Sequence, residues 1–76
     1  MNKKEFLDIL YEQLSGQMPE GNIAAHVQYY RNYIEEQQRT GRTESDILNE
    51  LGDPRLIART LLDTETEGSG SGRSPY

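Results

Sequence analysis

The sequence contains no cysteine and a single histidine, His26. Without cysteine the chain forms no disulfide and no thiolate metal site, which suits a reducing compartment. One imidazole without cysteine or a second histidine does not build an ordinary protein metal site. His26 is also the one histidine that could act as a base beside a nucleophile. We therefore expect no cofactor, no metal ion and no enzymatic activity.

A concentrated basic face and a long apolar run are also missing. Eight lysines and arginines stand against 13 acidic residues, and the resulting net charge of -5 argues against a nucleic-acid surface. No apolar run reaches about 18 residues and the N-terminus has no signal-peptide pattern, so this segment is not expected to insert into a membrane. Only 33% of the 76 residues are apolar, which allows one small domain with a thin core. Binding to a partner or to a second copy is therefore expected.

The residues that are present form a helical pattern with no strand pattern. Asn2 and Glu5 form a capping box that opens a helix over residues 3–15, and Gly16 is its stop. One stripe of this helix carries the apolar residues Phe6, Leu7, Leu10, Tyr11 and Leu14. The second and longest helix begins near Pro19, with Asn22 as the alternative N-cap, and ends near residue 39 or 40. Its inner stripe is Ile23, Val27, Tyr30 and Ile34.

Two short helices follow, separated by a corner. Thr43 with Asp46 opens the third helix, whose inner face is Ile47, Leu48 and Leu51. The corner consists of Leu51, Gly52, Asp53 and Pro54. Gly52 can adopt the left-handed conformation that ends a helix, Asp53 can cap the next helix, and Pro54 suits the first helical position. The fourth helix is expected over residues 54–63, with Leu56, Ile57, Ala58, Leu61 and Leu62. The predicted fold is all-α: a small bundle of two longer and two short helices.

The composition changes after Asp63. Residues 64–67 are polar and residues 68–72 alternate glycine with serine, which is typical of a flexible linker. We expect a helical domain over residues 1–63 and a flexible tail over residues 64–76. An engineered linker is one interpretation of the glycine–serine run, and a natural tail is the other.

The order of these features resembles the HAAS domain, a helical signalling domain also catalogued among DUF1700-type bacterial proteins. The matching pieces are residues 1–7, the turn Met18-Pro19-Glu20, the pair Tyr29-Tyr30, and the closing pattern of Gly41, Ile47, Leu48, residues 51–54, Ile57 and Ala58. The corner at residues 51–54 is the most specific piece. Gly21-Asn22 departs from the family's usual charged helix formers at the start of the second helix.

The resemblance implies a signalling or adaptor role without enzymatic activity. Such domains usually form the cytoplasmic N-terminus of small membrane proteins and are encoded beside PadR-like winged-helix repressors. It therefore implies a PadR-like regulator as the protein partner, a location at the inner face of the cell membrane, and transmembrane helices further along the full-length protein.

Four side chains are candidates for binding a partner. Tyr29 and Tyr33 are four residues apart on one flank of the second helix, and aromatic residues concentrate at the centres of interfaces. Arg55 and Arg59 share one face of the fourth helix and could pair with an acidic partner. In the alternative interpretations, which involve no partner, the tyrosines cover the flank of the bundle and the arginines are solvated.

Two other functions compete with the signalling role. The first is a structural domain that self-associates into a homo-oligomer. The second is DNA binding, because two short helices joined by a tight turn resemble a helix-turn-helix. The acidic chain and the largely apolar segment at residues 54–62 argue against the second.

Overall fold

The computed structural model describes the backbone of residues 1–70 and the side chains of residues 1–64. Four helices follow one another: α1 (Lys3–Leu14), α2 (Glu20–Arg39), α3 (Glu44–Leu51) and α4 (Pro54–Gly70). Within the described range there is no strand, so the predicted all-α fold is confirmed.

Local side-chain hydrogen bonds fix the starts of the helices. Asn2 Oδ1 accepts from the Glu5 N–H at 2.8 Å, and the Glu5 carboxylate accepts from the Asn2 N–H at 3.3 Å, which completes the predicted capping box. Thr43 Oγ1 accepts from the Asp46 N–H at 3.1 Å. Pro19 is the N-cap of α2, so the start near Pro19 is confirmed and the alternative N-cap at Asn22 is wrong.

The corner between α3 and α4 lies where the sequence placed it. Asp53 Oδ1 accepts from the Arg55 N–H at 2.8 Å, and Pro54 is fully buried as the first residue of α4. The predicted left-handed helical conformation of Gly52 is wrong in one angle: φ is 87°, but ψ is -161°. This region is open almost only to glycine, whereas the left-handed helical region also admits asparagine. The chain leaves α3 extended and turns sharply into α4.

Two apolar clusters form the core, and α1 contributes to both. The first contains Phe6, Leu7, Ile34, Ile47 and Leu48. The second contains Leu10, Leu14, Ile23 and Ala58. The first cluster therefore joins α1 and α2 to α3, and the second joins them to α4.

Tyr11 is an exception to the predicted apolar stripe of α1. Its side chain is 41% exposed, and its hydroxyl donates to Glu20 Oε1 at 2.7 Å. This hydrogen bond raises the pKa of the Tyr11 hydroxyl above its usual value. Because a phenol can satisfy its hydroxyl at the surface, Tyr11 lies outside the core that Leu10 occupies.

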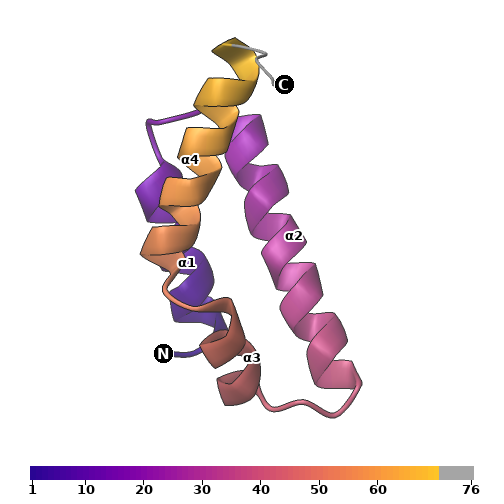
Figure 1. Cartoon of the computed structure of the whole chain (residues 1–76). Coiled ribbons are helices and arrows are strands. Elements are labelled where there is room, and N and C mark those ends of the chain that lie inside the picture. The colour runs from indigo at the N-terminus through magenta and orange to yellow at the C-terminus, as the bar shows by residue number, and fades with distance from the viewer. Residues whose placement is uncertain (71–76) are drawn as a thin grey trace, which may run out of the picture.

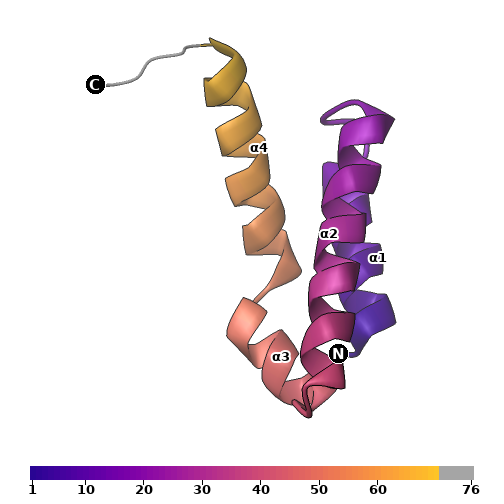
Figure 2. The ribbon, with the colours of Figure 1, turned by 90° about the vertical axis from the view of Figure 1, so that its right-hand side faces the viewer.

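The helices are not packed evenly around one another. α1 packs against both α2 and α4, and α3 packs against the C-terminal half of α2. The backbones of α2 and α4 approach each other less closely than either approaches α1, although Ile23 of α2 and Ala58 of α4 belong to the same core cluster. Figure 2 shows α4 standing apart from α2, and Figure 1 shows α1 and α4 running in the same direction with α2 opposite. α1 is therefore the helix against which both α2 and α4 pack.

The predicted end of the fourth helix at Asp63 is wrong. α4 continues to Gly70, and its last turns extend past the start of α2 (Figure 1). Residues 64–67 contain no proline or glycine to stop the helix, and glycine at Gly68 costs only about 1 kcal/mol relative to alanine. Residues 71–76 of the predicted tail lie outside the described residues.

Candidate functional site: an apolar groove between α2 and α4

A groove of about 290 Å³ opens between α2, α3 and α4. Its lining consists of one residue from α2, one from α3 and four from α4: Tyr30, Leu51, Leu56, Ile57, Thr60 and Leu61. None of these side chains is charged. The Thr60 hydroxyl donates to the Leu56 carbonyl of its own helix at 3.1 Å, so it presents little unsatisfied polarity to the groove.

Two large side chains at the edges of the groove are exposed. Leu56 is 68% exposed on the α4 side. Tyr29 is 63% exposed on the α2 side, where its ring contacts Tyr30 edge-on with centroids 5.1 Å apart. Burial, followed by the neighbouring Tyr29, raises the pKa of the Tyr30 hydroxyl, so Tyr30 stays neutral at physiological pH. The groove is therefore uncharged on its walls and apolar at both edges.

A polar network holds the α3 end of this groove. Arg42 Nη1 donates to Glu50 Oε1 at 2.6 Å and to Gln37 Oε1 at 3.1 Å. The hydrogen bond that Arg42 donates to Glu50 is the main cause of the raised pKa of Arg42. Because Glu50 precedes Leu51, this network fixes α3 against α2 and so positions the Leu51 wall.

The structure separates the four side chains predicted to bind a partner. Tyr29 lies at the edge of the groove, whereas Tyr33 is half-buried against the first core cluster and donates to Glu50 Oε1 at 3.5 Å. Arg55 and Arg59 do not line the groove, although each directly precedes a lining residue and Arg59 lies three residues after Leu56. Arg55 also lies 3.6 Å from Asp53 Oδ1. That these four residues bind a partner stays a prediction.

The sequence interpretation missed Leu56 as a surface residue. Leu56 was grouped with the apolar residues of the fourth helix, yet it lies two positions from buried Ala58, on the opposite side of the helix. A helical projection centred on Ala58 would have placed Leu56 outside the buried stripe.

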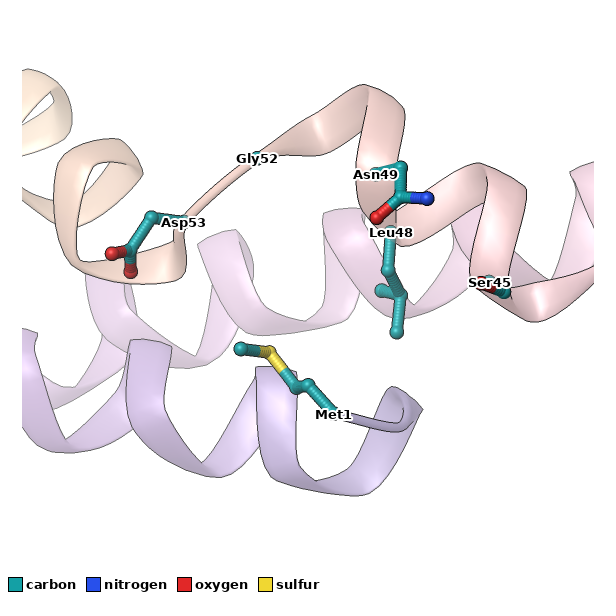
Figure 3. A pocket seen from close by; sticks show the side chains of 6 residues that line it. All are labelled: Met1, Ser45, Leu48, Asn49, Gly52 and Asp53. Atoms are coloured by element: carbon teal, nitrogen blue, oxygen red, sulfur yellow. The ribbon is translucent and has the colours of Figure 1, made fainter.

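A second hollow of about 400 Å³ lies beneath the corner. Figure 3 shows Leu48 pointing from α3 toward α1, with the Met1 side chain on the far side of the hollow, beside the start of α1. Its one carboxylate, Asp53, is already an acceptor for the start of α4, and the remaining polar lining is Ser45 and Asn49. This hollow offers no acid–base pair, and it is best explained as space left by the sharp turn.

A third hollow of about 300 Å³ lies on the other flank of α2. Lys3 Nζ lies 3.1 Å from Glu35 Oε2 of α2, and Lys4 Nζ lies 2.8 Å from Asp8 Oδ2 of its own helix, while the third cation of the lining is Arg31. These are exposed ion pairs of little energetic weight. The lining of this hollow therefore carries both signs of charge, with three cations and two carboxylates.

The described side chains contain no group of His, Cys, Asp and Glu suited to a metal ion. Among helices in the described chain, none is both long and apolar enough to cross a membrane. Of the three hollows described above, the groove between α2 and α4 is the one lined entirely by uncharged residues, and that chemistry suits binding to an apolar surface.

Comparison with known proteins identifies one family. The sequence model of the HAAS family matches residues 5–60, which cover α1, α2, α3 and the first part of α4. No match was found among curated proteins or among solved structures.

Proposed function

Because this chain belongs to the HAAS family, we propose that it is a non-enzymatic signalling domain that works by binding another protein. The family assignment is consistent with a signalling or interaction module. The observation that carries the proposal is the groove between α2 and α4, where Leu56 and Tyr29 are exposed beside an uncharged lining. Exposed apolar residues that adjoin a groove are characteristic of protein-binding surfaces.

The partner in this proposal is a PadR-like winged-helix transcription regulator, and the full-length protein holds the domain at the inner face of the cell membrane. The net charge of -5 supports such a partner, because a protein that binds DNA carries basic surface that an acidic domain attracts. Binding of the domain would then report the state of the membrane protein to the regulator.

Titration calorimetry with the purified regulator encoded beside this protein tests the proposal. We expect saturable binding with one domain per regulator protomer and a negative heat-capacity change, because apolar surface is buried. Absence of heat at high micromolar concentrations of both proteins would refute it.

We further propose that the domain does not itself bind DNA, although the α3–α4 corner resembles a helix-turn-helix. Arg55 lies beside Asp53, and residues 44–63 carry five carboxylates against two arginines. A mobility shift on DNA that weakens with salt would show the opposite.

A further inference from the structure

The three longer helices occupy three positions of a four-helix arrangement. α1 packs on both α2 and α4, as a corner helix contacts its two neighbours in a four-helix bundle. The backbones of α2 and α4 are packed less closely than those of the two pairs that include α1 (Figures 1 and 2), and the apolar groove lies between α2 and α4. The position diagonal to α1 is therefore open.

We propose that the protein partner inserts one amphipathic α-helix with basic flanks into this groove and completes a four-helix bundle. This inference rests on the proposed function and adds the form and the charge of the bound segment. Leu56 and Tyr29 would contact its two sides, and Tyr30, Ile57 and Leu61 would contact its apolar stripe.

The groove is lined over residues 56–61 of α4, about 9 Å, between two helices that are longer than this lining. At about 1.5 Å per residue, the 20 residues of α2 span roughly 30 Å and the 17 residues of α4 span roughly 25 Å. The α4 side chains that line the groove, at positions 56, 57, 60 and 61, repeat with the spacing of one helix face. A partner helix of about four turns presents anchors at the same spacing, which is the usual pattern for a helix bound in a groove.

Charge distinguishes a basic helix from a second copy of this chain. Two copies would bring together two net charges of -5, and the α3–α4 arm beside the groove is itself acidic. Of the two arginines of that arm, Arg55 lies 3.6 Å from Asp53 Oδ1, and Arg59 lies three residues after Leu56, on the exposed side of the groove edge. A helix whose apolar stripe is flanked by lysines or arginines meets this field favourably.

Two probes test the inference with isotope-labelled domain in amide chemical-shift titrations. One is the regulator itself. The other is a synthetic helix of about 18 residues with leucines on one face and lysines beside them, compared with a version that carries glutamates in place of the lysines. We expect shifts along the groove sides of α2 and α4, and binding of the lysine helix that is at least about tenfold tighter than that of the glutamate helix.

The matched variants are Leu56→Glu and Ala24→Glu. Each adds one negative charge at an exposed helix position, and Ala24 shares a face with Arg31, on the flank of α2 away from the groove. Because Leu56 is buried only in the complex, Leu56→Glu should weaken both probes by about 10- to 100-fold, and Ala24→Glu by less than about threefold. Leu56→Gln, which removes the apolar contact without adding charge, should weaken binding by about tenfold.

The outcomes separate this inference from the proposed function. If the regulator binds the Leu56→Glu variant as tightly as the unsubstituted domain, the groove assignment is wrong and the signalling function stands. If the regulator does not bind at all, the function fails, and the shifts caused by the lysine helix still decide whether the groove accepts a helix. Sedimentation showing a dimer that Leu56→Glu dissociates would assign the groove to a second copy and overturn the inference.

Discussion

Gly52→Ala should destabilise the domain through the backbone alone. Gly52 has φ 87° and ψ -161°, a region that residues with a Cβ atom rarely occupy. A Cβ atom placed there meets no other heavy atom within 4 Å, so no steric contact with neighbours contributes. The expected cost is therefore the conformational strain, about 1–3 kcal/mol.

This loss is measurable by urea unfolding and by thermal melting. For a domain of this size, 1 kcal/mol corresponds to about 4–8 °C in the melting temperature. Gly52→Asn is the discriminating variant. If the conformation were left-handed helical, asparagine would be tolerated better than alanine, whereas the observed ψ makes the two substitutions about equally costly.

Gly21→Ala is the matched control. Gly21 lies in the first turn of α2 without a positive φ, and a Cβ atom there also meets nothing within 4 Å. Alanine should therefore stabilise the domain by roughly 0.5–1 kcal/mol, because it reduces the entropy of the unfolded chain. A Gly52→Ala variant as stable as the unsubstituted protein would refute the reasoning. A Gly52→Asn variant that recovers most of the unfolding free energy lost in Gly52→Ala would also refute it.

Three further changes probe the cap, the core and the groove tyrosine. Asp53→Ala removes the acceptor for the Arg55 N–H and should lower the free energy of unfolding in urea by about 0.5–2 kcal/mol. Asp53→Asn keeps an acceptor oxygen and should retain most of this stabilisation. Ile34→Ala creates a cavity at a fully buried site and should cost about 2–5 kcal/mol, against roughly 0.5–1.5 for Ile34→Val. The raised pKa of Tyr30 contributes stability that is fully present below its unfolded pKa near 10.0 and is lost as the pH rises through the higher folded pKa. Urea unfolding on both sides of that range should show a smaller alkaline loss for Tyr30→Phe, and an unchanged loss would contradict the assignment to Tyr30.

The sequence predicted the features that depend on a few neighbouring residues. The caps at Asn2, Thr43 and Asp53 each join a side chain to a backbone N–H two or three residues away, so the local pattern is sufficient. The position of the corner follows from the same kind of chemistry. The family suggested by these residues is confirmed by the match over residues 5–60.

The features that the sequence missed depend on contacts between distant segments or on the absence of a stop. Tyr11 is exposed because Glu20, across the next turn, accepts its hydroxyl hydrogen. α4 continues past Asp63 because a polar composition alone does not end a helix. The sequences of α2 and α4 do not predict how far apart these helices lie. Each has an apolar stripe, but the sequence does not show which other helix packs on that stripe.

α3 covers only part of the face of α2 that adjoins the groove. α3 packs on α2, but its eight residues span only about 12 Å of the roughly 30 Å of that helix. About 18 Å of α2, or roughly three turns, is therefore left uncovered by α3, and α4 is held against α1 instead of crossing to cover it. The Gly52 conformation reinforces this separation, because it directs α4 away from the end of α3 rather than back across α2. A longer helix in place of α3 would have closed the bundle, so the short helix and the sharp corner together leave Leu56 and Tyr29 available to a partner.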